Sequence, residues 1–301
     1  MINIEKVCRK YSISLKKVEY YDSYFLLFSD DNIYLLKEKS FDEKLFSYFE
    51  RIGYSYYLKK INEDIDPYLL YLYPMDIKNN GAVTSKELIK GITDLQLKTV
   101  YEEEISEEEF ENIYKTILND IDYQMKYYLD LQDYIEEFSF PRIDYYYFLL
   151  HISLLYKIIQ KARYYLDLWY QKKNLKFRKC YSIHDVSFSN FIVSESSYFL
   201  DFGNCYKDFL ITDFICFYKN EALSVDMNFL FDIYQKDIFL SEEELLLLKV
   251  FICIPKKVEF SKSTYNNTVS IYYLLEYIEK TNSFLEKYEK YQEANKDEFK
   301  E

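Results

Sequence analysis

The sequence predicts an α+β protein in which a small antiparallel sheet precedes a larger, mainly helical part. Short runs rich in Tyr, Phe, Val, Ile and Leu, which are typical of strands, occur within residues 1–75. Long stretches with apolar residues at helical spacing fill most of the remainder. The 301 residues include only four glycines and four prolines, which favours long helices over a turn-rich β sandwich.

Composition and charge argue against several classes of function. The formal net charge is −13, so a polyanion would be repelled and we expect no nucleic-acid partner. The five cysteines contain no CxxC pair, which predicts reduced thiols and no zinc site. The sequence has no apolar run of about 18 residues, so no membrane span is expected. The first residues lack the apolar segment of a signal peptide, which predicts a cytoplasmic protein.

The first elements are predicted in order along residues 1–53. A short helix is expected within residues 1–12, followed by strands in the runs KKVEYYDS, YFLLFS and NIYLLKEK. The third strand ends on Lys37. A helix follows, closed by Gly53 at the position after its last turn. Its apolar face is formed by Phe41, Leu45, Phe49 and Ile52.

Two more strand-like runs precede the first domain boundary. They are Tyr54–Leu58 and Tyr68–Tyr73, separated by Asp66-Pro67. Pro74 and the polar run DIKNNG then interrupt the pattern. We therefore expect an N-terminal domain of a β-sheet plus one helix over residues 1–75, and a helical C-terminal domain over residues 76–301.

The C-terminal domain is predicted to be a bundle of long helices. Apolar stripes at helical spacing indicate that these helices bury one face each. The stripes lie in residues 107–138, 144–173 and 265–292, and a shorter apolar helix ends at Pro255. A short β interruption, Tyr181–Tyr218, divides the helices.

The β interruption is predicted to contain a hairpin. The apolar runs Phe191–Val193 and Tyr198–Leu200 are joined by a polar turn, SESS. If Val193 pairs with Tyr198, Asn190 lies directly opposite Asp201, with Cα atoms roughly 4.5–5.5 Å apart. An amide oxygen and a carboxylate would then converge, and such oxygen ligands suit Mg²⁺, which completes its shell with phosphate and water.

Further residues fit phosphoryl transfer, which needs a metal, a carboxylate that orients the nucleophile and a cation on the phosphates. Asp185 lies five residues before Asn190, where it could accept the proton of an attacking hydroxyl. Lys37 is the candidate cation, and Glu43 or Glu50 on the next helix is its candidate partner. The competing interpretation is an ordinary hairpin with surface carboxylates.

In this order the motifs resemble the aminoglycoside-phosphotransferase and choline-kinase branch of the kinase-like fold. Within that branch the layout is most similar to the CotS-type spore coat proteins of endospore-forming bacteria. The motifs that carry the resemblance are IHDVSFSNFIV, YFLDFGN and ITDFICF. The resemblance implies a bilobal protein-kinase-like fold that uses ATP and Mg²⁺.

The resemblance also implies roles for individual residues. Asp185 matches the catalytic-loop aspartate, Asn190 and Asp201 match the metal-binding residues, and Lys37 matches the third-strand lysine. The hinge residues that would contact adenine are Leu72, Tyr73 and Met75. The catalytic loop departs from the family at Ile183, a position that is commonly His.

Two functions remain open at this point. The first is an ATP- and Mg²⁺-dependent phosphotransferase, associated with the spore coat, whose substrate is a small molecule or a coat protein. The alternative is a catalytically weak or inactive kinase-like structural protein of the coat, in which the 36 tyrosines serve interaction or cross-linking. In both cases we expect the protein in the mother-cell cytoplasm during sporulation, or incorporated in the coat beside other coat proteins. An acidic helical adaptor without a site is a third, weaker interpretation.

Overall fold

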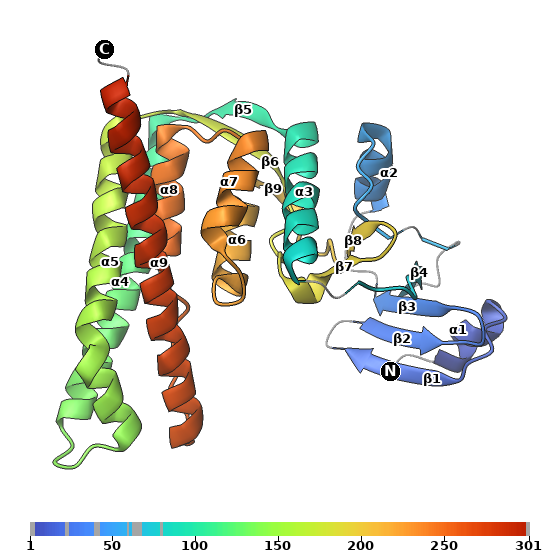
Figure 1. Cartoon of the computed structure of the whole chain (residues 1–301), viewed down its shortest axis with the longest axis horizontal. Coiled ribbons are helices and arrows are strands. Elements are labelled where there is room, and N and C mark those ends of the chain that lie inside the picture. Colours follow the sequence, from blue (N-terminus) through green and yellow to red (C-terminus); the bar gives the residue numbers. More distant parts are fainter. Residues whose placement is uncertain are drawn as a thin grey trace. The chain divides into compact units, whose positions relative to one another are not determined.

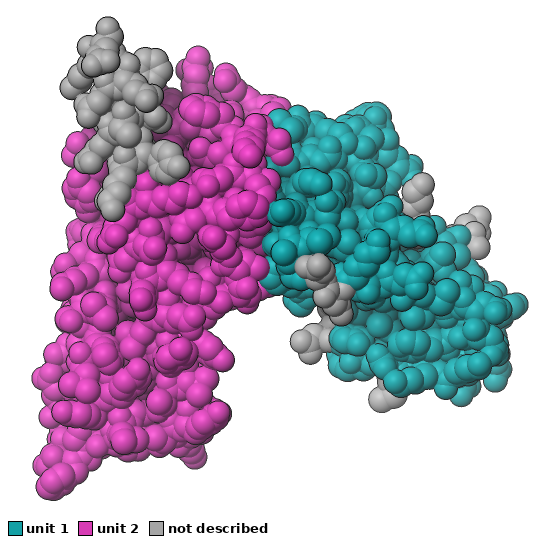
Figure 2. Space-filling model, in the orientation of Figure 1, with its two compact units in different colours: residues 1–99, 181–207 teal, residues 100–180, 208–301 magenta. Residues whose placement is uncertain are grey.

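The computed structural model describes residues 4–21, 24–38, 43–58, 60–61, 68–78 and 81–298, without the side chains of residues 38, 43 and 289–298. The chain forms two compact units, coloured separately in Figure 2. Unit 1 contains residues 1–99 and 181–207, and unit 2 contains residues 100–180 and 208–301. The predicted fold class is confirmed, because an antiparallel sheet near the N-terminus precedes a mainly helical part.

The sheet of unit 1 has four antiparallel strands in the order β1-β2-β3-β4 (Figure 1). The strands are β1 (Lys17–Tyr21), β2 (Tyr24–Phe28), β3 (Ile33–Glu38) and β4 (Tyr68–Tyr73). Leu27, Leu36 and Leu70 pack on one face, in the same cluster as Val7 of α1 (Ile4–Lys10). Leu35 belongs to the core cluster of the other face. Because side chains alternate along a strand, Lys37 lies on the face of Leu35.

The helix after the sheet ends as the sequence predicts, but the next segment does not form the predicted strand. Helix α2 (Glu43–Ile52) is closed by Gly53, whose φ of 69° suits glycine. Tyr54–Leu58 does not join the four-stranded sheet. Instead, Tyr57 forms an isolated bridge with Phe199, and the Phe199 N–H donates to the carbonyl of Tyr56 over 2.9 Å. The predicted Phe41 and Asp66-Pro67 lie outside the described residues.

Helix α3 (Gly81–Thr99) completes unit 1 by packing against the hairpin of β7 (Phe191–Val193) and β8 (Ser197–Phe199). The two elements approach closely at Gly91, where an added Cβ would lie 3.0 Å from ring atoms of both Phe199 of the hairpin and Tyr56. The absence of a side chain at Gly91 therefore allows the helix to approach the hairpin closely.

Unit 2 is a helical bundle in which α5 packs against α4, α8 and α9 (Figure 1). Its helices are α4 (Glu107–Glu136), α5 (Ile143–Lys172), α6 (Thr212–Glu221), α7 (Met227–Asp237), α8 (Glu242–Ile252) and α9 (Thr264–Glu298). Capping boxes at Ser106 and Ser241 start α4 and α8, because each serine exchanges hydrogen bonds with the glutamate three residues later. None of the described helices is long and apolar enough to cross a membrane.

None of the three strands of the sheet of order β5-β6-β9 was predicted. Its strands are β5 (Tyr101–Glu104), β6 (Lys176–Ser182) and β9 (Tyr206–Phe209). The acidic run of β5 lacks an apolar strand pattern, yet it pairs with the basic start of β6. Glu102 faces Arg178, Glu104 faces Lys176, and an ion pair joins Glu103 to Lys179. Opposite charges across the strands therefore favour a pairing that local propensity does not reveal.

The compact units do not divide the chain at residue 75. Unit 1 joins the predicted N-terminal domain to α3 and to the segment 181–207, which carries the hairpin. The division into functional lobes over residues 1–75 and 76–301 stays a prediction.

Candidate active site

The hairpin has a register that differs by one residue from the predicted one. Val193 pairs with Ser197, so the connection contains only residues 194–196. Within it, both the N–H and the hydroxyl of Ser194 donate to the carbonyl of Ser196, over 2.8 and 3.1 Å. The predicted pairing of Val193 with Tyr198 is therefore wrong, because the serine turn closes on itself one residue earlier.

Asn190 consequently lies opposite Leu200 rather than Asp201. The Leu200 N–H donates to the Asn190 carbonyl over 3.0 Å. Asp201 is nevertheless close, because the Asn190 side-chain amide donates to the carbonyl of Asp201 over 3.3 Å and to that of Asp185 over 2.7 Å. These bonds use the amide nitrogen and leave the side-chain oxygen as the atom of Asn190 that can hold a ligand.

The loop before the hairpin places Asp185 at the surface. His184 adopts a left-handed conformation with φ of 62°, and its Nδ1 lies 3.0 Å from the Ser182 carbonyl. The His184 ring stacks on Tyr206, with centroids 3.8 Å apart. These contacts fix a sharp bend between Ile183, which is buried, and Asp185, which is exposed. His184 therefore shapes the loop that presents Asp185.

Lys37 reaches the same place from the sheet. Its side chain is buried, and its ammonium group forms an ion pair with Asp201 Oδ1. The Gly203 N–H donates to the same oxygen over 2.6 Å. Of the two glutamates predicted to pair with Lys37, the Glu43 side chain lies outside the description and Glu50 is exposed. In the described part of the chain, the partner of Lys37 is Asp201.

The surroundings of Asp185 shift its pKa. Although the residue as a whole is exposed, partial desolvation of its carboxyl group and the negative charge of Asp201 raise the pKa of Asp185 above its ordinary value, and Lys37 opposes the rise. A carboxylate with a raised pKa is a better proton acceptor near neutral pH. The structure therefore brings Lys37, Asp185, Asn190 and Asp201 into one electrostatic centre.

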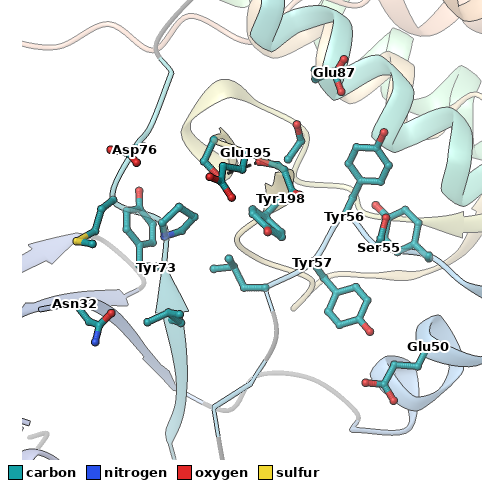
Figure 3. Close-up of a pocket in the computed structure, with 18 of the residues that line it drawn as sticks. Asn32, Glu50, Ser55, Tyr56, Tyr57, Tyr73, Asp76, Glu87, Glu195 and Tyr198 are labelled. Carbon is teal, nitrogen blue, oxygen red and sulfur yellow. Dashed lines mark hydrogen bonds between the residues drawn. The ribbon is translucent and has the colours of Figure 1, made fainter.

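The predicted hinge residues lie elsewhere within unit 1. Leu72, Tyr73 and Met75 line a cavity of about 1050 Å³ (Figure 3). Leu72 and Met75 are 50% and 62% exposed. None of the four residues of the charged centre is among the described residues that line this cavity. Adenine contact by the hinge stays a prediction.

The fold is similar to those of solved phosphotransferases. An aminoglycoside phosphotransferase from Alicyclobacillus acidocaldarius matches with a TM-score of 0.67 and 10% identity, over 98% of this chain and 97% of its own. This chain has the aminoglycoside-phosphotransferase fold. A spectinomycin phosphotransferase in complex with ADP and spectinomycin matches with a TM-score of 0.61 and 10% identity, over 93% and 97% of the two chains. Neither a protein-family model nor a curated protein matches the sequence.

In this phosphotransferase fold, the residues of the charged centre fit Mg²⁺ that is shared with phosphate. The described residues contain no group of three or more His, Cys, Asp or Glu side chains placed to hold a metal. Asn190 Oδ1 and the Asp201 carboxylate would supply two oxygen ligands, and Mg²⁺ commonly takes one or two carboxylates with phosphates and waters as the remainder. The oxygen donors therefore suit a metal that arrives with a nucleotide.

One polar contact of the centre was not predicted. The Gly203 N–H holds the Asp201 carboxylate by a turn that spans Asp201, Phe202 and Gly203. The signal is present in the sequence as Asp-Phe-Gly, because an aspartate often accepts a hydrogen bond from the N–H two residues later. This contact orients Asp201 independently of Lys37.

Proposed function

We propose that this chain is an ATP- and Mg²⁺-dependent phosphotransferase of small molecules that carry a hydroxyl group. One observation carries the proposal: Lys37, Asp185, Asn190 and Asp201 converge although they come from a strand, a loop and the two sides of a hairpin. These side chains supply the cation, the proton acceptor and the metal ligands that phosphoryl transfer requires. The shared fold supports the same reaction class.

Each residue has a distinct role in the proposed reaction. Asp185 accepts the proton of the acceptor hydroxyl while the bond from the terminal phosphorus to the leaving ADP oxygen breaks and the bond to the acceptor oxygen forms. Lys37 contacts the phosphates that are not transferred. Asn190 and Asp201 would hold Mg²⁺, which neutralises phosphate charge. Leu72, Tyr73 and Met75 are proposed to contact adenine.

Thermal unfolding with Mg-ATP tests the nucleotide site. A ligand at ten times its dissociation constant stabilises a protein by about 1.4 kcal/mol, which raises Tm by a few degrees for a chain of this size. We expect this rise in the wild type and its loss in Asp201→Asn. The control is Asp122→Asn, which changes an exposed carboxylate of α4 and should respond like the wild type.

Transfer itself is tested by ADP release in the presence of hydroxyl-bearing amines, including spectinomycin. The Asp185→Asn variant should keep the Mg-ATP stabilisation and lose about 10²–10⁴-fold in turnover, since proton transfer contributes roughly that factor. A wild type that is not stabilised by millimolar Mg-ATP would contradict the proposal. An Asp201→Asn variant that responds as strongly as the wild type would contradict the assignment of the metal ligands.

Spore-coat association is a second proposal, and exposed tyrosines favour it. Tyr20, Tyr123, Tyr164 and Tyr265 are 67%, 65%, 60% and 76% exposed, which makes them accessible to oxidative cross-linking. If the protein acts in the coat as a structural component, Asp185→Asn should assemble normally and leave spore resistance unchanged. Reduced resistance with normal assembly would instead assign the coat function to phosphotransfer.

A further inference from the structure

The cavity behind the predicted hinge is built from separate segments of unit 1. They are Asn32 between β2 and β3, Glu50 of α2 with residues 53–58 that follow the helix, residues 72–76 at the end of β4 and beyond it, Glu87 of α3, and residues 194–198 at the turn of the hairpin (Figure 3). The charged centre lies at the opposite, open end of the same hairpin, where Asn190 precedes β7. The three residues of β7 separate the two ends by roughly 10 Å, at about 3.3 Å per residue.

The walls of the cavity carry negative charge. Its carboxylates are Glu50, Asp76, Glu87 and Glu195, and each comes from a different one of these segments. No Lys or Arg is among the described residues of the lining. Such walls repel the phosphates of a nucleotide and attract a cation.

Two lysines of α3 lie near the rim and are already paired. Lys90 binds the Glu87 carboxylate over 2.6 Å. Lys98 binds Asp94 over 2.8 Å and donates to the Gly53 carbonyl over 2.7 Å. In the described part of the chain, no ion pair involves Glu50, Asp76 or Glu195. These three carboxylates therefore remain to bind an external cation.

Aromatic rings form much of the remaining wall. The tyrosines of the lining are Tyr54, Tyr56, Tyr57, Tyr73 and Tyr198. The face of an aromatic ring attracts an ammonium group, and the attraction adds to that of a nearby carboxylate. The lining therefore combines carboxylates for charge with rings for a hydrocarbon chain, apart from the hinge residues Leu72, Tyr73 and Met75, which the proposed function assigns to adenine.

We propose that this cavity binds a linear organic polyamine, at a site separate from the charged centre. A single metal ion does not fit, because the carboxylates are dispersed around about 1050 Å³ and no three acidic, His or Cys side chains of the described residues converge on one point. Ligand cavities usually measure roughly 300–1,000 Å³, so an extended molecule suits the space. Several ammonium groups on one flexible chain reach separate carboxylates, while the methylenes lie against the rings.

Calorimetric titration of the full chain with spermidine, without nucleotide, tests the proposal. We expect one binding site in the wild type and a loss of affinity of about tenfold or more in the combined variant Glu50→Gln, Asp76→Asn, Glu195→Gln. The charge-matched control is Asp130→Asn, Asp133→Asn, Glu137→Gln, which removes three exposed carboxylates from the end of α4 and its C-cap. This control should bind spermidine like the wild type.

Several results would overturn the inference. The absence of spermidine binding to the wild type would overturn it. An equal loss of spermidine affinity in the two combined variants would also overturn it, because that result indicates attraction by net charge alone. Binding of 1,8-octanediol as strong as that of spermidine would show that charge is not recognised. Tighter binding of tetralysine than of spermidine would assign the surface to a basic peptide instead. The Mg-ATP stabilisation should persist in the cavity variant, so failure of this proposal is distinguishable from failure of the proposed function.

Discussion

The buried ammonium group of Lys37 forms an ion pair with the carboxylate of Asp201, and this pair connects the third strand of the sheet to the open end of the hairpin. Asp201 is held a second time by the Gly203 N–H, over 2.6 Å. The carboxylate therefore keeps a hydrogen-bond donor if the lysine is removed, whereas among the described residues the lysine has only this carboxylate as its partner. This asymmetry makes Lys37 suitable for a test that separates folding from nucleotide binding.

Lys37→Met should reduce Mg-ATP binding more than it reduces stability. Losing one partner of a fully buried pair costs about 3–5 kcal/mol, but the Asp201 side chain is 26% exposed and keeps Gly203, so the loss should be smaller. We expect a folded protein in urea titrations and a loss of affinity for Mg-ATP of at least about tenfold. Lys287→Met, which removes a surface ion pair with Asp232, should leave nucleotide affinity unchanged. Unchanged affinity in Lys37→Met would contradict the proposed phosphate contact.

Asp185 should make stability depend on pH in a defined direction. Its pKa is raised in the folded protein, chiefly by partial desolvation of the carboxyl group and then by Asp201, so the folded state binds this proton more tightly than the unfolded state. The stability associated with the protonated group is therefore lost as pH rises from the ordinary aspartate value through the raised pKa. Asp185→Asn should thus be more stable than the wild type at pH 7, with a smaller difference at pH 4. Urea unfolding at the two pH values measures this, and an equal difference at both would contradict the assignment.

Asp144 should have the opposite dependence on pH. Burial alone would raise its pKa, but Arg142 over 2.5 Å and the Asn267 amide over 2.7 Å lower it by more, so the net pKa is below its ordinary value. The stability it provides is present above the ordinary aspartate pKa and is lost as pH falls through the lowered value.

Asp144→Ala should therefore destabilise the protein more at pH 7 than at pH 3. At pH 7 the loss includes about 1–3 kcal/mol for the one N–H of the buried Asn267 amide that loses its acceptor, since the amide nitrogen keeps only its bond to the Ser261 carbonyl. The matched control, Asp122→Ala, removes an exposed pair with Arg163 and should cost less than about 1 kcal/mol. Equal losses in the two variants at pH 7, measured by urea unfolding, would show that the Asp144 contacts do not stabilise the bundle.

Gly91 should tolerate alanine poorly although it lies within a helix. Alanine gains about 0.5–1 kcal/mol of helix stability, but its Cβ would lie 3.0 Å from the rings of Phe199 and Tyr56, and overpacking of this kind costs about 1–3 kcal/mol. We expect a net loss of about 1 kcal/mol. Gly81→Ala is the control, because nothing lies within 4 Å of its added Cβ. Equal unfolding free energies for the two variants would indicate that the hairpin moves freely away from α3.

Local patterns predicted most of the secondary structure correctly. The three N-terminal strands, the glycine-closed helix and the long helices follow from residue-to-residue periodicity, which tertiary contacts reinforce. The predictions that were wrong depended on neighbours distant in sequence. Tyr54–Leu58 has strand-like residues but meets Phe199 instead of the sheet, and Tyr101–Glu104 lacks them yet forms a strand opposite the basic residues of β6.

The residues of the candidate site were predicted from the sequence, but the hydrogen bonds and the ion pair that join them were not. The order of Asp185, Asn190 and Asp201 along the chain places all three near one hairpin, whatever its exact register. The register itself depends on how the serine turn closes. Because the observed register differs by one residue from the predicted one, Leu200 lies opposite Asn190 in place of Asp201. Side-chain hydrogen bonds from Asn190 then keep Asp201 in the centre.

The sequence by itself determined most of the elements and the fold class, and it predicted the four polar residues of the centre, because periodicity and turn chemistry act over a few residues. Only the tertiary structure decided that Lys37 pairs with Asp201, since an ion pair depends on which face of β3 meets the hairpin. It also decided that carboxylates from dispersed segments surround one tyrosine-lined cavity. That arrangement has no local signal, because its residues become neighbours only when α2, α3, the hinge and the hairpin turn pack together.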